Sequence, residues 1–300
     1  MRIGLVVVCV AVAVLAGCSS AGPSGEPRST PSSGPPSVSA APQSPAPGTH
    51  TQALYVNGVR RTFMLHAPEG YVPGTPVPLV IGLHCRPCSA AFFRGLSGLD
   101  ATADKHGFLV AYPDGVSGMF NGMTCCGDAD DVTFLRELAR HLVATWSVDA
   151  KRVFLTGISN GADMSFRAAV ESQGVFAAIA AISGGYIGTR AEDAGYVPRV
   201  PISVLTIIGT VDPTFPSYNV GIAAWQDRLK CPSSSAPGLS PADARTVATC
   251  ADGSTVDVHR VTGMGHVWPG ASGGPLSWPN APFTAGEVIW AFFAAHPRIG

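Results

Sequence analysis

The chain has 300 residues, of which 46% are hydrophobic and only 13% are charged, a composition that can bury a large core. Its 19 Lys and Arg residues are balanced by 20 Asp and Glu residues, for a formal net charge of -1. No basic stripe stands out along the chain, so we expect no nucleic-acid partner.

The N-terminus has the pattern of an export signal. Arg2 precedes an apolar run, residues 3–15, that is too short to span a bilayer as a helix. The run ends in the letters LAGC at residues 15–18, which resemble the lipobox of bacterial lipoproteins, where cleavage precedes a lipidated cysteine. We therefore expect residues 1–17 to be removed and Cys18 to anchor the protein on the extracellular or periplasmic side of the membrane. The alternative is an ordinary secretory signal that contains a cysteine.

A low-complexity segment follows the signal. After Cys18, residues 19–48 are almost wholly Ser, Pro, Gly, Ala and Thr, without apolar periodicity. Such a segment cannot offset the entropy lost on folding, so residues 18–48 are expected to form a disordered tether. The length of the remaining segment, 49–300, suits one α/β domain better than two small domains.

Short apolar runs alternate with segments of helical period in this domain. This pattern predicts a mostly parallel sheet with helices on both faces, the α/β class. A hairpin is expected over residues 51–68, with its turn at Asn57-Gly58. Buried strands are expected at 78–84, 108–113, 152–157, 177–183 and 202–209, and helices at 98–105, 131–146, 160–173 and 285–295.

The chain contains eight cysteines. Cys9 is lost with the signal and Cys18 is lipidated, which leaves an even number of cysteines in the mature domain. An even number of cysteines in an exported protein predicts disulfides. Cys231 and Cys250 flank a loop rich in Ser and Pro and are expected to close it.

The four remaining cysteines allow three pairings that the sequence does not separate, among Cys85, Cys88, Cys125 and Cys126. The spacing Cys85-x-x-Cys88 also fits zinc. Adjacent cysteines are poor tetrahedral partners and the compartment is oxidising, so we expect no metal.

A serine lies between two glycines where an apolar run meets a helical one. Gly157-Ile158-Ser159-Asn160-Gly161 matches G-x-S-x-G, in which a strand turns sharply into a helix and exposes the serine hydroxyl. The run "RVFL" supplies the strand and "ADMSFRAAVE" the helix. Ser159 is therefore a candidate nucleophile, and a purely structural turn is the alternative.

A serine nucleophile of this kind needs an acid and then a histidine, in that order along the chain. Asp212 follows the predicted strand at 202–209 in "VLTIIGTVDPTFP" and precedes a proline. The rival acids are less well placed, because Asp227 falls in a helical segment and Asp252 and Asp257 lie in or near a strand.

Three histidines follow Asp212. His259 alternates with valines in a strand, and His296 ends the last predicted helix. His266 lies in the glycine-bracketed loop "TGMGHVWPG" directly after a strand, the setting that a proton-shuttling base requires. We expect His266 to be the base.

Backbone N–H groups are expected to hold the oxyanion that forms during attack. One donor is Asn160, after the nucleophile, and the other is at Cys85 or Arg86, after the strand at 78–84. His84 in the same loop is interpreted as a hydrogen-bonded anchor of the loop.

Several segments together resemble one family. "PLVIGLHCRPCSAAFF", "HGFLVAYPDG", "CCGDADDVTFLREL", "IIGTVDPTFP" and "GMGHVWPG" are similar to segments of exported α/β-hydrolase esterases, a group that includes feruloyl esterases, polyhydroxyalkanoate depolymerases and bacterial lipoproteins. The resemblance covers nearly all of residues 49–300. It implies the α/β-hydrolase fold, a triad of Ser159, Asp212 and His266, and no cofactor.

One position departs from the family. Cys85 stands where the family usually has glycine after the histidine of the oxyanion loop. The resemblance makes the N–H of Arg86 the second oxyanion donor beside that of Asn160. A cysteine here also allows a disulfide from this loop to Cys125 or Cys126.

These features predict a serine esterase for small-molecule or cell-wall and polysaccharide-linked esters, with hydroxycinnamoyl, acetyl or short-chain acyl groups. Trp268 is expected to bind substrate, and Phe120 and Phe215 to line an apolar pocket with it. A polyhydroxyalkanoate depolymerase is the alternative, less expected because such enzymes commonly carry a further binding domain and the sequence ends at Gly300. A second alternative is a non-catalytic envelope-binding lipoprotein. Membrane contact is expected only through the lipid anchor.

Overall fold

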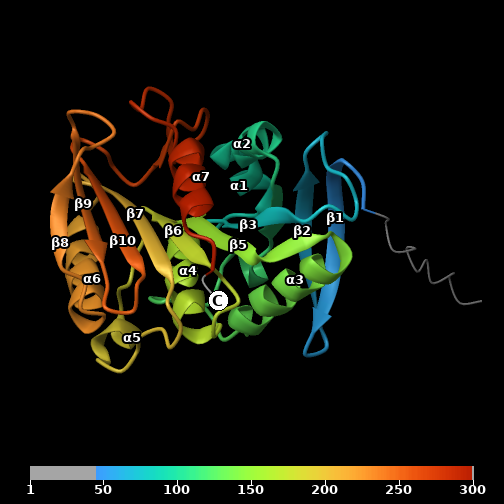
Figure 1. Ribbon diagram of the computed structural model, residues 1–300, viewed down its shortest axis with the longest axis horizontal. Coiled ribbons are helices and arrows are strands. Elements are labelled where there is room, and N and C mark those ends of the chain that lie inside the picture. Colours follow the sequence, from blue (N-terminus) through green and yellow to red (C-terminus); the bar gives the residue numbers. More distant parts are fainter. Residues whose placement is uncertain (1–44, 299–300) are drawn as a thin grey trace, which may run out of the picture. The chain divides into compact units, whose positions relative to one another are not determined.

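An antiparallel hairpin opens the described part of the chain, which comprises residues 45–298 of the computed structural model (Figure 1). Strands β1 (Gly48–Val56) and β2 (Val59–Ala67) pair with Val56 opposite Val59. Asn57 and Gly58 take φ values of 50° and 78°, the left-handed conformations that a two-residue turn requires, so the predicted hairpin is confirmed. The expectations for the signal, for Cys18 and for most of the tether lie outside the described residues.

The hairpin joins the edge of a ten-stranded sheet whose order is β1-β2-β4-β3-β5-β6-β7-β10-β9-β8. The central strands from β4 to β10 are parallel, and the strands at both edges are antiparallel to their neighbours. The remaining strands of this sheet are β3 (Val77–Leu83), β4 (Leu109–Pro113), β5 (Val148–Ile158), β6 (Ala178–Ile182), β7 (Ser203–Gly209), β8 (Ser233–Ala236), β9 (Asp243–Thr249) and β10 (Thr255–Val261).

Helices cover both faces of the sheet, so the predicted α/β class is confirmed (Figure 1). One face carries α1 (Ala90–Ser97), α2 (Leu99–His106) and α7 (Ala285–Ala295), and the other carries α3 (Asp131–Thr145), α4 (Asn160–Glu171) and α6 (Phe215–Arg228). Short elements complete the fold: η1 (Val116–Gly118), α5 (Thr189–Glu192), and the strand pair β11 (Trp268–Pro269) and β12 (Ser277–Trp278).

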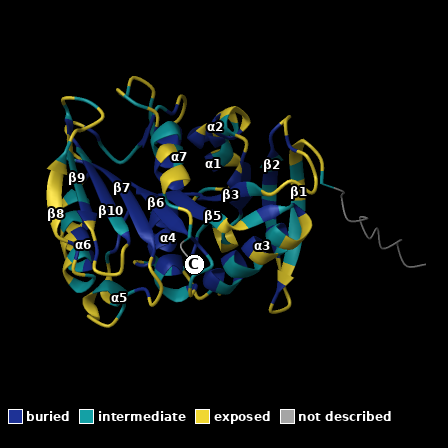
Figure 2. Cartoon of the chain, viewed as in Figure 1, coloured by how far each residue is buried: buried dark blue, intermediate teal, exposed yellow. Residues whose placement is uncertain are grey.

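Two apolar cores hold these layers together, one on each face of the sheet. Phe134, Phe166 and Trp225 of α3, α4 and α6 belong to the first core. Phe93 and Phe293 of α1 and α7 belong to the second. The central strands β6 and β7 are buried along their whole length (Figure 2). The ends of these strands therefore form a rigid base for the loops that follow them.

The sequence patterns missed α1 and the antiparallel pair β8–β9. Helix α1 is only eight residues long and begins at Ser89, whose Oγ accepts from the N–H of Phe92 at 3.2 Å. Strand β8 is almost wholly exposed, so it carries no apolar alternation that could reveal it. Within residues 45–298, no helix is long and apolar enough to cross a membrane.

Residues 45–298 contain three disulfides. Cys231 is bonded to Cys250 and closes the loop that contains β8 and β9. Cys85 is bonded to Cys88, and Cys125 to its neighbour Cys126. Of the three pairings that the sequence left open, the structure has the one in which each pair is close in the chain, so no disulfide joins Cys85 to Cys125 or Cys126.

Candidate active site

Ser159 lies at the sharp turn from β5 into α4. Its backbone has φ 56° and ψ -123°, a conformation that costs on the order of 1–3 kcal/mol and persists only where the surroundings impose it. The N–H of Ser159 donates to the carbonyl of Ile182 at 3.1 Å, and its carbonyl accepts from the N–H of Asp163 at 3.0 Å. These bonds fix a half-buried serine at the tip of the turn.

The glycines of the motif are required by close packing. A Cβ on Gly157 would lie 2.5 Å from the carbonyl carbon of Gly161. A Cβ on Gly161 would lie 2.2 Å from the carbonyl oxygen of Leu83, at the end of β3. The turn at Ser159 therefore packs directly against the loop that begins at His84.

Asp212 and His266 meet although 54 residues separate them. Asp212 Oδ2 lies 2.7 Å from His266 Nδ1, and the side chains are 1% and 33% exposed, respectively. The other carboxylate oxygen accepts from the N–H of Thr214 at 2.8 Å. With Nδ1–H donated to the buried carboxylate, Nε2 is the imidazole nitrogen left to take or give a proton.

A short series of hydrogen bonds links the His266 loop to the turn at Ser159. Ser183 Oγ donates to the carbonyl of Val267, next to His266, at 3.0 Å. Ser183 follows Ile182, whose carbonyl accepts from the N–H of Ser159. Parallel strands β5, β6, β7 and β10 thus bring their carboxyl ends, and the segments that follow them, to one edge of the sheet.

The side chains of the two predicted oxyanion donors, Asn160 and Arg86, both contact the Cys125–Cys126 disulfide. The side chain of Asn160 is tied to the backbone of Phe120 by hydrogen bonds of 2.8 and 2.9 Å, and its Nδ2 lies 3.8 Å from Cys125 Sγ. Arg86 Nη1 lies 3.5 Å from Cys126 Sγ. The backbone N–H of Asn160 is in the first turn of α4, where no intrahelical acceptor exists.

Comparison with known proteins shows what this chain is similar to. The family described as Esterase PHB depolymerase matches residues 62–197. The chain is similar to feruloyl esterases and to a poly(3-hydroxyalkanoate) depolymerase. It is a carboxylic ester hydrolase.

Individual relatives agree with this assignment. NocK of Nocardia uniformis subsp. tsuyamanensis, whose name calls it an esterase, is 29% identical over 80% of this chain and 78% of its own length. Feruloyl esterase B of Piromyces equi is 32% identical over 54% of this chain, which spans only 31% of that protein. The solved acetyl xylan esterase of Aspergillus awamori is 15% identical, with a TM-score of 0.62 over 82% of this chain and 99% of its own. That likeness supports the α/β-hydrolase fold.

His84 anchors the loop after β3 in this esterase. Its Nε2 accepts from the N–H of Gly115 at 2.9 Å, so Nδ1 carries the proton and donates to the carbonyl of Cys85 at 2.7 Å. Burial lowers the pKa of His84 below its ordinary value and outweighs the bond to Cys85. A neutral imidazole with both nitrogens bonded fits the interpretation as a loop anchor.

Trp268 of the esterase does not reach a substrate surface, contrary to expectation. The side chain is 1% exposed, its Nε1 donates to the carbonyl of Ser97 at 3.2 Å, and its ring meets that of Phe93 edge-on at 5.1 Å. Phe120 is also fully buried. Trp268 instead holds the segment after His266 against α1 through its contacts with Ser97 and Phe93. Burial of its large apolar ring stabilises this packing.

Asp163 is a buried carboxylic acid beside the proposed catalytic residues, and the sequence interpretation missed it. Its Oδ1 accepts from the N–H of Gly185 at 2.9 Å, and its Oδ2 accepts from Thr124 Oγ1 at 3.0 Å. Burial raises the pKa of Asp163 from 3.8 to about 6, while these hydrogen bonds and the charge of His266 oppose the rise. Asp163 follows Ser159 by four residues, about one helical turn, so the sequence alone could have placed its side chain on the same side of α4 as Ser159.

The raised pKa of Asp163 predicts a pH-dependent stability. The unfolded carboxyl ionises near pH 3.8 and the folded one near pH 6, so the contribution of Asp163 to the free energy of unfolding falls as pH rises through this interval. Asp163→Asn removes the titration. The free energy of unfolding of Asp163→Asn relative to wild type should therefore rise by about 3 kcal/mol from about pH 4 to about pH 7, measured by urea denaturation.

A matched control is Asp149→Asn. Hydrogen bonds from Lys151 and Arg152 outweigh the burial of Asp149 and hold the pKa of its carboxyl below the ordinary value. Its substitution should therefore produce no rise in this pH interval. A difference between Asp163→Asn and wild type that is independent of pH would contradict the raised pKa.

Proposed function

We propose that the protein is an exported serine esterase in which Ser159 attacks the ester carbonyl, His266 is the general base and Asp212 orients the imidazole. The observation that carries this proposal is the 2.7 Å contact between Asp212 and His266 at the sheet edge that also bears the Ser159 turn. The chain order Ser159, Asp212 and His266 is also that of the α/β-hydrolase triad, which supports these proposed roles.

Acylation is the first half of the proposed reaction. His266 Nε2 takes the proton of Ser159 Oγ while the oxygen forms a bond to the carbonyl carbon. The N–H groups of Asn160 and Arg86 stabilise the resulting oxyanion, and loss of one such donor typically costs about 3 kcal/mol. The ester C–O bond then breaks, and the departing alcohol takes the proton from His266.

Deacylation reverses these roles with water as the nucleophile. His266 takes a proton from water, the hydroxide attacks the acyl carbon, and the bond to Ser159 Oγ breaks. Ser159 regains its proton from His266 and the carboxylic acid leaves. Every proton and electron pair in this cycle is supplied by the chain, the ester or water.

The proposed substrate class rests on the names of the sequence relatives. Relatives named feruloyl esterase and acetylxylan esterase support hydroxycinnamoyl, acetyl or short-chain esters, free or linked to cell-wall polysaccharide. A polyester hydrolase is the second candidate, favoured by the description of the matching family.

The cellular location is proposed from the N-terminal sequence. An export signal ending before Cys18 would leave the domain anchored by lipid on the outer side of the membrane. The three disulfides support an oxidising compartment.

Labelling with a fluorophosphonate probe tests the proposal. The probe should attach to the wild-type protein at Ser159 alone, as read by mass spectrometry of the labelled peptide. Labelled protein should no longer hydrolyse p-nitrophenyl acetate. A properly folded protein that neither reacts with the probe nor hydrolyses any ester would instead be the non-catalytic binding lipoprotein. Clearing of polyhydroxybutyrate granules without activity on small esters would favour the polyester hydrolase.

A further inference from the structure

A cavity of about 660 Å³ lies beside the proposed oxyanion loop. One wall is formed by residues 85–89 and by Phe92 at the start of α1. The opposite wall is formed by Pro275 and Leu276. We call this cavity the proline–disulfide pocket, after Pro87, Pro275 and the bonded pair Cys85–Cys88.

Both walls of the proline–disulfide pocket belong to segments that carry proposed site residues. Arg86, a proposed oxyanion donor, is itself part of the first wall. The second wall is joined to the His266 loop, because the N–H of Trp268 donates to the carbonyl of Leu276 at 2.7 Å. A group bound between these walls would therefore lie between the oxyanion loop and the histidine loop.

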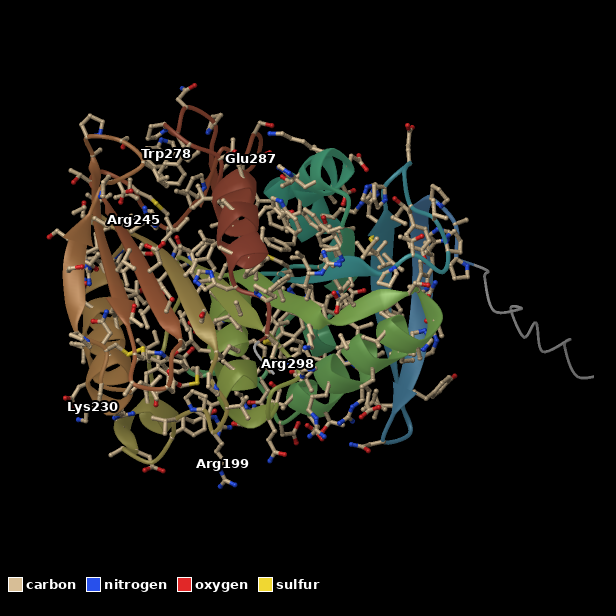
Figure 3. The ribbon with its side chains drawn as sticks, in the orientation of Figure 1. Arg199, Lys230, Arg245, Trp278, Glu287 and Arg298 are labelled. Atoms are coloured by element: carbon tan, nitrogen blue, oxygen red, sulfur yellow. A yellow bond between two sulfur atoms is a disulfide. The ribbon has the colours of Figure 1, made fainter. Side chains whose placement is uncertain are left out.

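Both walls are also held in place. The disulfide closes the Cys85–Cys88 loop, and the N–H of Cys88 donates to the carbonyl of Gly118 at 3.1 Å. On the other side, Trp278, labelled in Figure 3, packs against the apolar core on the α7 face and pairs with Pro269. The pocket therefore has rigid walls, which favour a rigid ligand over a flexible one.

The chemistry of the walls is mostly apolar. Phe92 is 38% exposed although it is a large aromatic residue, and Leu276 lines the same pocket. The hydroxyl of Ser89 already serves as the cap of α1. A half-exposed phenyl ring, a leucine, two prolines and a disulfide together make a surface that gains by covering an apolar group.

Arg86 is the one cationic residue among those that line the pocket. Its guanidinium contacts the sulfur atoms of Cys125 and Cys126, and in residues 45–298 no carboxylate lies within ion-pair distance of it. A guanidinium without a carboxylate partner is available to stack on the face of an aromatic ring. This feature favours a planar aromatic ligand over an alkyl chain.

The volume of the pocket also favours an aromatic ligand. Cavities of roughly 300–1,000 Å³ hold ligands of many heavy atoms. An acetyl group would leave most of 660 Å³ to water, and an aromatic acyl group would displace that water from Phe92 and Leu276.

We propose that the proline–disulfide pocket binds the acyl part of the ester, and that it selects aromatic acyl groups over acetyl. This inference rests on the proposed function and assigns its substrate preference to particular residues. Phe92 packs against the aromatic ring from one side and Leu276 from the other.

A pair of esters with the same alcohol isolates the acyl group. For Phe92→Ala, kcat/KM should fall about tenfold with p-nitrophenyl cinnamate and stay within about twofold with p-nitrophenyl acetate. Leu276→Trp, which fills the pocket, should lower the cinnamate value further and again spare the acetate. Tyr55→Ala is the matched control, since Tyr55 is an exposed aromatic residue on β1 and should change neither value.

The other outcomes separate the two proposals. An equal loss with both esters in Phe92→Ala would mean that the pocket holds the p-nitrophenyl alcohol, which overturns the acyl assignment. A wild-type protein that prefers acetate over cinnamate would overturn the aromatic preference and leave the proposed esterase intact. Absence of hydrolysis of every ester, together with absence of fluorophosphonate labelling, would overturn both.

Discussion

Substitution of Ser159 by alanine is expected to lower kcat/KM for p-nitrophenyl acetate by at least about 10⁴-fold, because no other group can form the acyl-enzyme. The backbone conformation at φ 56° is set by the neighbouring hydrogen bonds and by the packing of Gly157 and Gly161, and it does not depend on the hydroxyl. Thermal stability should therefore stay nearly unchanged. Measurements of kcat and KM, with a melting curve on the same sample, test both parts.

Ser165→Ala is the matched control for this variant. Ser165 lies on the same helix, α4, and is fully buried, and its Oγ donates back to the carbonyl of Gly161 at 3.0 Å. Its loss should leave the activity within about twofold. Wild-type-like hydrolysis by Ser159→Ala would overturn the proposed nucleophile.

A second large effect is expected from Asp212→Asn. An asparagine there cannot hold the His266 tautomer that leaves Nε2 free to accept a proton, nor stabilise the imidazolium that forms. We expect kcat to fall by about 10⁴-fold without loss of fold. Steady-state kinetics on esters with a good leaving group will measure the change.

A second Asp–His pair, Asp243 and His259, provides a matched control for Asp212→Asn. Asp243 Oδ2 lies 2.7 Å from His259 Nδ1, the same distance as in the Asp212–His266 pair, but both side chains are buried, on the neighbouring strands β9 and β10. The neighbouring Arg245, labelled in Figure 3, pairs with Asp257 at 2.7 Å in the same cluster. Asp243→Asn should lower stability and leave kcat per folded molecule within about twofold. Equal losses of kcat in the two variants would contradict the role of Asp212.

The two Asp–His pairs show which features of a site can be predicted from the sequence. The alternation of His259 with valines predicts a strand residue, and the structure buries it in β10 at 1% exposure. The glycines that bracket His266 predict a loop after that strand. Both inferences use local patterns, since strand alternation and loop composition depend on neighbours in the chain.

Other features depended on contacts between distant segments. Trp268 looked like a pocket residue from its place beside His266, but α1, which the sequence patterns missed, provides the carbonyl and the phenyl ring that bury it. Asp163 was overlooked because its burial comes from Thr124 and Gly185 on two separate loops.

The sequence by itself determined the alternation of strands and helices, the hairpin turn at Asn57-Gly58 and the local settings of Ser159, Asp212 and His266, because each depends on backbone preference and apolar periodicity over a few residues. Only the tertiary structure decided the strand order that brings Asp212 to His266, the pairing of Cys85 with Cys88, and the pocket between that loop and Leu276. These features arise where segments far apart in the chain pack against one another, and local preference carries no information about such contacts.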